Sequence, residues 1–327
     1  MRNIRWGILG PGAIAHSFTK GLTALPDAVI SAVGSRSLER AREFAQQYKI
    51  ATSYGSYEEL VHDPQVDIIY VATPHTLHKE CILLCLNAGK AVLCEKPFTL
   101  NAKEAEEVIH CARSVKQFLM EGMWTRFLPA IVKVRELLKN QVIGDIRQVK
   151  ADFGFQADWN PENRLFNPQL GGGALLDVGI YSTSFASMVF GVQPSQISSL
   201  SYLGETGVDE QYMALFGYQG GKLAALSGAV RTETPHDALI LGTDGYIKIP
   251  DFWHAQSVIL SLKGMEIEKF DIPYLGTGYQ YEAAEAMKCI REGKLESHIM
   301  PLQESLDIMK TLDHIRMQWG LKYPAEI

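Results

Sequence analysis

The sequence predicts an α/β protein in which a doubly wound parallel sheet is followed by an α+β domain with an open, mostly antiparallel sheet. Over roughly the first 120 residues, short apolar segments alternate with helical segments, as in parallel sheets covered on both faces. Beyond about residue 122 the strand segments lengthen and alternate apolar with polar side chains, as antiparallel strands do. The 327 residues suit two domains, which we place at residues 1–121 and 122–327.

In the first domain the elements follow from apolar periodicity and from capping signals. Strands are expected in IRWGILG, AVISAVGS, VDIIYVAT, KAVLCE and QFLMEG, and a short segment near residues 51–53 precedes the helix SYEELVHD. Helices are expected at residues 13–24, 38–48 and 78–88, and in SYEELVHD and AKEAEEVIHCAR. Ser56 with Glu59, and Asn101 with Glu104, match the capping box that opens the last two helices.

In the second domain a helix is expected in FLPAIVKVRELLKNQ. Strands are expected in DIRQVKADFGF, QISSLSYL, EQYMALFGY, KLAALSGAV, ALILGTDGYIKI and VILSLKGMEIEKF, and turn signals such as YQGGK and GTDGY separate them. One helix interrupts the sheet at about residues 173–190, and two more follow near 279–292 and 303–318. The sheet could present an apolar face to a second subunit.

Composition and charge exclude several classes of protein. The formal net charge is −6 and no block of Lys and Arg stands out, so we expect no nucleic-acid partner. The sequence shows no apolar signal stretch and no uninterrupted apolar run long enough for a bilayer, so we expect no membrane partner. The five cysteines lack framework spacing, which favours free thiols in a reducing cytoplasm. Cys81 and Cys85 lie one helical turn apart, but no second ligand pair follows them, which favours buried side chains over a metal site.

A glycine-rich segment follows the first strand. Gly10, Gly12 and Ala15 in GILGPGAIAHSF have the form G-x-G-x-x-A between a strand and a helix. Such a loop lets a pyrophosphate approach the backbone at the unsatisfied N–H groups of a helix N-terminus. An ordinary glycine-rich turn is the alternative, but the alternating β/α context favours a dinucleotide-binding Rossmann domain. We expect Gly10, Gly12, Ala13 and Ile14 to contact the cofactor.

The end of the second strand bears on which dinucleotide binds. NAD sites usually place an acidic residue there for the ribose hydroxyls, but this chain has Ser35, Arg36 and Ser37, and no acid before Glu39. A guanidinium flanked by hydroxyl groups suits a 2′-phosphate and can stack on adenine. We therefore expect NADP rather than NAD, with Arg40 also near the cofactor, although these arginines could instead simply face water.

The strand KAVLCE ends in Glu95 and Lys96, just before Pro97 and a capped helix. Charges at the end of a buried strand are costly unless they are used, and this end lies at the edge where parallel sheets bind ligands. The Lys96 ammonium could hydrogen-bond the substrate oxygen and stabilise developing alkoxide charge. Glu95 could accept a hydrogen bond from the nicotinamide ribose. A Glu–Lys pair that only caps the strand is the alternative.

The segment CEKPFTLNAKEAEEVI resembles the E-K-P signature of the glucose–fructose oxidoreductase / inositol dehydrogenase / MocA family. The similarity extends over essentially the whole chain, through the G-x-G-x-x-A loop, VATPHTLHKE and GGGALLDVGIY, and EGMWTRFLPA is most similar to the dimeric dihydrodiol dehydrogenase branch. The resemblance implies a Rossmann domain, an open and mostly antiparallel second domain, a catalytic Lys96, and a homodimer or homotetramer. It also allows a cis bond before Pro97.

The segment GGGALLDVGIYSTSF places Asp177 and Tyr181 four residues apart, on one face of a helix. Many members of the family carry Asp and His at these positions, so Tyr181 argues against a histidine proton carrier. Tyr181 could accept the carbinol proton if Lys96, from the other domain, lowers its pKa. Asp177 could hold a sugar or diol hydroxyl. The alternative is a core tyrosine and an aspartate that ties the helix to a loop.

Four further residues are candidates for contact with the substrate. Trp124 and Arg126 follow the last strand of the first domain and could line the cleft, or could be a core tryptophan and a surface arginine. Phe153 and Trp159 are candidates for the pocket wall.

At another strand end, Thr73 and Pro74 are expected to border the cofactor, as the similar loop of the family implies, with His78 near it. His75 and His78 lie three residues apart, but no acidic or cysteine partner suggests a metal, so no metal site is expected and polar contacts at the helix start are favoured.

These features predict an NADP-dependent oxidoreductase that transfers a hydride between nicotinamide and a carbinol or carbonyl carbon of a sugar or cyclic trans-diol. Tyr181 would be the acid/base, with Lys96 as its electrostatic partner. The alternative from another class is a non-catalytic NADP-binding sensor or scaffold, because fold alone does not establish activity. The alternative among enzymes is an NADPH-dependent reductase of dicarbonyls or anhydro sugars. The partner in each enzyme case is a small polyol, sugar or diol.

Overall fold

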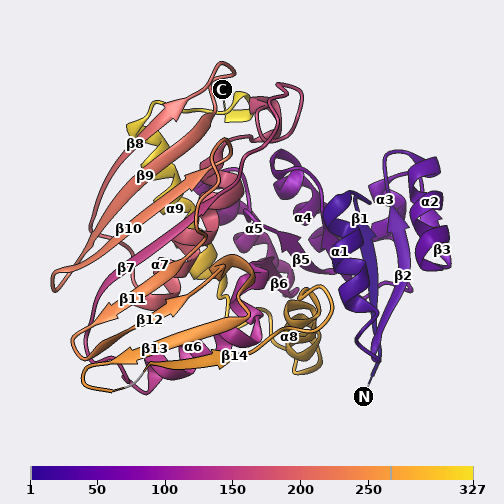
Figure 1. Cartoon of the computed structure of the whole chain (residues 1–327). Coiled ribbons are helices and arrows are strands. Elements are labelled where there is room, and N and C mark those ends of the chain that lie inside the picture. The colour runs from indigo at the N-terminus through magenta and orange to yellow at the C-terminus, as the bar shows by residue number, and fades with distance from the viewer. Residues whose placement is uncertain (1, 266, 327) are drawn as a thin grey trace. The chain divides into compact units, whose positions relative to one another are not determined.

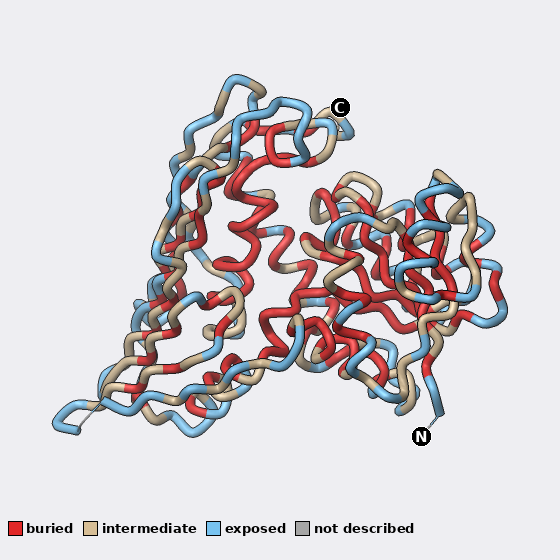
Figure 2. The backbone as a smooth tube through the Cα atoms, turned by 45° about the vertical axis from the view of Figure 1, so that its right-hand side comes forward, coloured by how far each residue is buried: buried red, intermediate tan, exposed pale blue. Residues whose placement is uncertain are grey.

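The computed structural model describes residues 2–265 and 267–326, and it divides into two compact units. Unit 1 comprises residues 1–124 and 275–306, and unit 2 comprises residues 125–274 and 307–327. Within each unit the buried residues lie in the strands and helices, while the loops are largely exposed (Figure 2).

Unit 1 is built on a six-stranded sheet whose neighbouring strands are all parallel, in the order β3-β2-β1-β4-β5-β6 (Figure 1). The chain order reverses between β1 and β4, which makes this a doubly wound sheet with a switch point at that pair. The predicted fold class is confirmed. The strands are β1 Ile4–Leu9, β2 Ala28–Gly34, β3 Thr52–Tyr54, β4 Ile68–Val71, β5 Ala91–Glu95 and β6 Leu119–Gly122.

The helices of unit 1 begin where the capping signals predict. Asn101 Oδ1 accepts the Glu104 N–H at 2.9 Å, and the Glu104 carboxylate reaches back to the Leu100 N–H at 3.1 Å. Ser56 Oγ likewise accepts the Glu59 N–H at 3.1 Å. The helices are α1 Ala13–Leu22, α2 Leu38–Tyr48, α3 Tyr57–Val61, α4 His78–Asn87 after the 3₁₀ turn His75–Leu77, α5 Ala102–Val115 and α8 Gln280–Arg291.

The segment 275–306, which the sequence analysis placed in the second domain, belongs to unit 1 because α8 packs against α1. The Thr277 hydroxyl donates to the Ser17 carbonyl oxygen at 3.0 Å. A Cβ on Gly21 would lie 3.0 Å from the Gln280 nitrogen, so a glycine in α1 permits the close approach. Local periodicity identifies α8 as a helix but carries no information about which core buries it.

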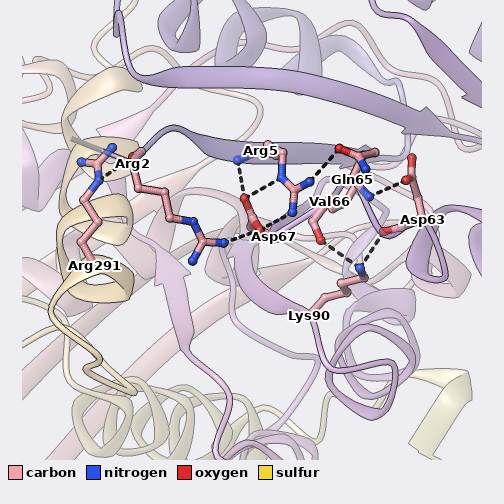
Figure 3. Close-up of polar contacts among 8 residues, drawn as sticks. All are labelled: Arg2, Arg5, Asp63, Gln65, Val66, Asp67, Lys90 and Arg291. Atoms are coloured by element: carbon pink, nitrogen blue, oxygen red, sulfur yellow. Dashed lines mark hydrogen bonds and ion pairs between the residues drawn. The ribbon is translucent and has the colours of Figure 1, made fainter.

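A network of paired charges closes the amino edge of the unit 1 sheet (Figure 3). The Arg5 guanidinium donates to both oxygens of Asp67, at 3.0 and 2.8 Å, and Arg2 adds a bond of 2.8 Å. Lys90 Nζ donates to the carbonyl oxygens of Asp63 and Val66 at 2.6 and 2.8 Å. Burial would raise the pKa of Asp67, but the hydrogen bonds from Arg5 outweigh burial and hold that pKa below its usual value.

Unit 2 is built on an eight-stranded sheet in the order β14-β13-β12-β11-β7-β10-β9-β8 (Figure 1). Every neighbouring pair is antiparallel except β7 with β10, so the predicted mostly antiparallel sheet is confirmed. Each of the last two predicted strand segments is a hairpin of two strands, and the GTDGY turn lies between β11 and β12. The strands are β7 Ile146–Gly154, β8 Gln196–Leu203, β9 Asp209–Tyr218, β10 Lys222–Ala229, β11 Ala238–Gly242, β12 Gly245–Ile249, β13 Ser257–Leu262 and β14 Glu268–Asp271.

A buried helical segment packs against the unit 2 sheet. Residues Leu175–Gly179 form a π-helical turn that continues into α7 (Ile180–Phe190), which packs against β7 and β10. By length and composition alone, the segment Pro168–Phe190 could cross a membrane, and the sequence analysis overlooked it. Because 83% of its apolar window is buried, it has the surroundings of a core helix. The remaining helices are α6 Pro129–Lys139 and α9 Leu302–Gln318, of which α9 continues from unit 1 into unit 2.

Candidate active site

The loop after β1 brings a helix N-terminus to the carboxyl edge of the unit 1 sheet. Gly10 has φ 89°, and a Cβ there would lie 3.2 Å from the Ala72 carbonyl oxygen, so both conformation and packing require glycine. Gly12 is the N-cap of α1, and a Cβ there would meet no protein atom within 4 Å. Protein packing therefore does not explain Gly12, whereas the approach of a phosphate to the α1 N-terminus does. Ala13 is exposed and Ile14 is half-buried in the first turn.

The residues after β2 form a short hydroxyl-lined turn. Ser35 Oγ accepts the Ser37 N–H at 3.2 Å, and Ser37 Oγ caps α2 by accepting the Arg40 N–H at 3.4 Å. Arg36 and Arg40 are both exposed, and Arg36 lines a cavity of about 500 Å³. The other lining residues include Ser56, Tyr57, Leu77, Glu80 and Leu84.

The loop after β4 is tied to the loop after β5 by His78. The buried imidazole faces the Thr73 carbonyl oxygen at 2.9 Å through Nε2 and the Pro97 carbonyl oxygen at 2.9 Å through Nδ1. Burial lowers the pKa of His78. The ring thus braces the backbone on both sides of the predicted cofactor site, with Thr73 buried and Pro74 half-buried beside it.

At the end of β5, Glu95 is buried and Lys96 is half-buried, and the Lys96–Pro97 peptide bond is cis. The Tyr70 hydroxyl, from β4, donates to Glu95 Oε1. Burial, together with the charges of Glu95 and Glu282, raises the pKa of Tyr70, so this hydroxyl keeps its proton and remains a donor. Glu95 is therefore oriented from within the sheet.

Two more carboxyl groups lie at this edge. Glu121 Oε1, on β6, accepts the Phe98 N–H at 3.1 Å. Glu282, on α8, is fully buried, and among the described residues neither of its oxygens has a hydrogen-bond partner. Burial and the neighbouring charge of Glu95 raise the pKa of Glu282 well above its usual value. A concentration of buried acids beside a lysine is typical of functional sites.

In unit 2, Tyr181 lies in an aromatic cluster. Its ring meets the edge of Phe153, at the end of β7, with centroids 5.4 Å apart and an interplanar angle of 64°. Phe153 in turn stacks on Trp253 at 4.7 Å and 12°. The cluster restricts the Tyr181 ring to one orientation. Nothing in the sequence around Trp253 marks it as part of this site.

Asp177 is buried in the π-helical turn just before α7, and its Oδ1 pairs with Arg164 Nη1 at 2.6 Å. Arg164 comes from the irregular segment after β7, and about half of its side chain is exposed. The predicted tie between helix and loop is thus present, and it orients a carboxylate one turn before Tyr181. π-Helical turns are frequent at functional sites.

The remaining substrate candidates have different surroundings. Trp124 is buried and stacks on Tyr279 with centroids 4.7 Å apart, within unit 1. Arg126 is buried in unit 2, where it donates to the Ser184 hydroxyl at 3.1 Å and to the Ser184 carbonyl at 2.8 Å, so the alternative of a surface arginine is wrong. Trp159 is 36% exposed beside Phe166.

Sequence reasoning missed Tyr70, Trp253 and Glu282. Tyr70 lies in the apolar run DIIYVAT, where a buried hydroxyl needs a partner, so that residue carried a usable signal. Glu282 occupies the first turn of a helix, where a glutamate normally faces water and stabilises the helix dipole. Only the packing of α8 reveals that it is buried.

Comparison with known proteins agrees with this geometry. Residues 4–123 match an oxidoreductase family with an NAD-binding Rossmann fold, and residues 131–248 match the GFO/IDH/MocA C-terminal domain. The chain belongs to the GFO/IDH/MocA family. It is therefore an NAD(P)-dependent oxidoreductase.

Relatives in this family align with the whole chain. Trans-1,2-dihydrobenzene-1,2-diol dehydrogenase of Mus musculus is 42% identical and that of Xenopus tropicalis 41%; the alignments cover 99% and 98% of this chain and 99% of each relative. A 3-ketoreductase from Actinomadura kijaniata, solved with TDP-benzene and NADP, superimposes with a TM-score of 0.83 at 26% identity, covering 96% of this chain and 97% of that one.

Proposed function

We propose that this GFO/IDH/MocA protein is an NADP-dependent dehydrogenase that acts on the CH–OH group of a cyclic trans-diol or a sugar. The observation that carries the proposal is the full-length similarity, above 40% identity, to trans-1,2-dihydrobenzene-1,2-diol dehydrogenases. The half-buried Lys96 beside the buried carboxyl groups of unit 1 and the oriented tyrosine of unit 2 support it, because they provide a cation and a proton carrier.

In this proposal each residue of the site has its own role in the reaction. NADP⁺, when bound, accepts the hydride from the carbinol carbon. Tyr181 takes the hydroxyl proton as the carbon–oxygen bond becomes a carbonyl, and Lys96 stabilises the negative charge on that oxygen. Asp177, held by Arg164, would orient the neighbouring hydroxyl of the substrate. In carbonyl reduction the same groups act in reverse.

The preference for NADP over NAD rests on Arg36. The guanidinium lines the cavity beside the Ser35–Ser37 turn, where a 2′-phosphate would find a cation and two hydroxyl groups. Tyr57 lines the same cavity. The open space at Gly12 fits the pyrophosphate of either cofactor.

A spectrophotometric screen tests the activity. Purified protein is mixed with NADP⁺ and a panel of cyclic trans-diols and aldoses, and with NADPH and dicarbonyls or anhydro sugars. We expect the fastest absorbance change at 340 nm with a cyclic trans-diol. Tight NADP binding with no absorbance change for any compound would instead support a non-catalytic sensor.

A tyrosine pair tests the assignment of the acid/base. Tyr181→Phe should lower kcat by roughly 100-fold or more, because general acid–base catalysis contributes about that much, while NADP binding is retained. Tyr202→Phe removes the hydroxyl of an exposed tyrosine in β8 and should leave kcat unchanged. Normal turnover by Tyr181→Phe would contradict the mechanism.

We also propose that the chain is a homo-oligomer, a dimer or tetramer, that uses the outer face of the unit 2 sheet. Leu200 on β8, Met213 and Leu215 on β9 and Leu223 on β10 are exposed there by 82%, 73%, 62% and 51%. An apolar patch of this kind is typical of a subunit interface. Met213→Asp with Leu215→Asp should shift the mass measured by light scattering to that of the monomer. A monomeric wild type would contradict this proposal.

The cytoplasmic location also remains a proposal. All five cysteines are free thiols in the structure, which agrees with a reducing compartment.

A further inference from the structure

Asp209, the first residue of β9, is fully buried below the helical segment that carries Asp177 and Tyr181. Its Oδ2 accepts the Leu175 N–H at 2.7 Å, and the backbone N–H groups of Leu175 and Ala174 both act to lower its pKa. These are backbone donors at the start of the π-helical turn, where N–H groups have no partner within the helix. Asp209, which lies in a strand, thus caps the start of this helical segment in place of a residue next to it in the sequence.

The glycines before the turn make this contact sterically feasible. Gly173 has φ 116°, and a Cβ there would lie 2.2 Å from Asp209 Oδ1, so a side chain at this position would displace the carboxylate. On the neighbouring glycine, the Gly172 carbonyl oxygen accepts the Tyr323 hydroxyl at 2.8 Å. The GGG motif therefore permits the close approach of Asp209.

A second residue of β9 holds the other end of the same turn. Tyr212 lies against Gly179, where a Cβ would come within 2.6 Å of the Tyr212 hydroxyl oxygen, and that hydroxyl lies 3.1 Å from Ser182 Oγ. Asp209 and Tyr212 thus bind the helical segment before and after Asp177, and Tyr181 lies beside the second contact.

We propose that Asp209 is a positioning residue, whose negative charge holds the backbone at the start of this helical segment so that Asp177 and Tyr181 are aligned for the reaction. The inference rests on the proposed function of those two residues. Burial raises the pKa of Asp209 to about 7, although its backbone hydrogen bonds lower it. The charge is therefore present above neutral pH and lost below it, and the alignment should be lost with it.

The titratable groups around Asp209 include two tyrosines, a paired arginine and a paired aspartate. Burial, reinforced by the charge of Asp209, raises the pKa of Tyr212 and of Tyr323, so both keep their protons. Beyond Tyr323, the Arg316 guanidinium is neutralised by the Glu326 carboxylate at 2.5 Å and the Asp313 carboxylate at 2.8 Å. On the helical segment itself, Asp177 is paired with Arg164.

Asp209→Asn and Tyr323→Phe form a matched pair for the test. Asn keeps the shape and one oxygen acceptor but has no charge, whereas Phe at 323 removes an uncharged contact to the same triglycine segment. The kcat and KM of wild type and both variants are measured from pH 5.5 to 9 with NADPH and the carbonyl compound reduced fastest in the screen. Reduction is chosen because Tyr181 then acts as an acid and limits the rate only at alkaline pH.

We expect wild-type kcat to fall up to tenfold per pH unit below about pH 7, with little change in the KM for NADPH. Asp209→Asn should show no such fall and should stay roughly tenfold below the wild-type value at pH 8.5. Tyr323→Phe should keep the wild-type fall. A wild-type pH profile and normal kcat in Asp209→Asn would overturn the proposal, while the loss of activity in Tyr181→Phe would still support the proposed function.

A measurement that requires no turnover separates the two proposals further. The Leu175 amide resonance is followed by ¹⁵N–¹H NMR in the whole protein over the same pH range. It should titrate near pH 7 in wild type and in Tyr323→Phe, and not in Asp209→Asn. A Leu175 amide that does not respond to pH in wild type would overturn the role of Asp209 whatever the enzyme proves to catalyse.

Discussion

The two edges of the unit 1 sheet shift the pKa of their acidic residues in opposite directions. At the amino edge, the Asp67 carboxylate receives four hydrogen bonds from Arg2 and Arg5, and its pKa lies below the usual value (Figure 3). At the carboxyl edge, Glu95 and Glu282 are buried close enough to raise the pKa of Glu282. The first arrangement stabilises the charged form of its acid, and the second destabilises it.

The difference shows where this fold is built for stability and where it is built for chemistry. Paired charges at the amino edge hold the strand ends together. At the carboxyl edge, the crowding of buried acids destabilises their charged forms, and this is the edge where parallel sheets bind ligands. Substitutions at the amino edge should therefore change stability, and those at the carboxyl edge should change catalysis.

The largest expected effect is the loss of kcat on replacing Lys96 at the carboxyl edge, with Lys90 at the amino edge as the matched control. Lys96→Met should lower kcat by 100-fold or more, since loss of an electrostatic stabiliser costs about 2.7–4 kcal/mol in the transition state. Lys90→Met makes the same change at the amino edge, where the ammonium group binds two backbone carbonyls. It should lower the unfolding midpoint in urea and leave kcat unchanged. Equal kinetic effects of both variants would invalidate the comparison.

Arg36→Leu should raise the KM for NADP⁺ by roughly 10- to 100-fold, the equivalent of about 1.5–3 kcal/mol for a charge-assisted contact. The KM for NAD⁺ should stay nearly constant, because NAD⁺ has no 2′-phosphate. Arg42→Leu removes an exposed arginine from α2, the helix that follows Arg36, and serves as the control. A parallel rise in both cofactor constants for Arg36→Leu would mean that Arg36 does not select NADP.

Asp67→Asn should lower the free energy of unfolding by about 2 kcal/mol, because two arginines lose a charged acceptor in a partly buried setting. The folded pKa of Asp67 is depressed, so its contribution is complete above the ordinary value of 3.8 and declines as pH falls through the folded pKa. The stability gap between wild type and variant should therefore narrow below about pH 4. A gap that is constant from pH 3 to 7 would show that the charge is unimportant.

Glu282→Gln has the smallest expected effect of these variants. It should leave the free energy of unfolding nearly unchanged at pH 5 and should raise it at higher pH. The folded pKa of Glu282 is raised, so wild type loses stability as pH rises above the ordinary value of 4.5, by up to about 1.4 kcal/mol per pH unit while only the native state holds the proton. Glu285→Gln on the same helix is the control, since that carboxylate accepts the Ser297 hydroxyl at 2.7 Å. Identical pH slopes in all three proteins would contradict the raised pKa.

The fold was largely predictable because its signals are local. Apolar runs located five of the six strands of unit 1, and the capping pairs at Ser56 and Asn101 marked the starts of two helices. The same local signals left the partner of each element open. The parallel pairing of β7 with β10 and the packing of α8 on α1 join segments far apart in the chain, and no short stretch of sequence encodes either.

The candidate site divides in the same way. Gly10, Gly12, Glu95, Lys96, Asp177 and Tyr181 stand in motifs whose spacing implies chemistry, so the sequence alone was enough to nominate them. That Tyr70 binds Glu95, that Glu282 is buried beside it, and that Asp209 approaches Gly173 were decided only by the tertiary structure. The physical reason is that burial and proximity determine the pKa of an acid, and both are properties of the packed chain.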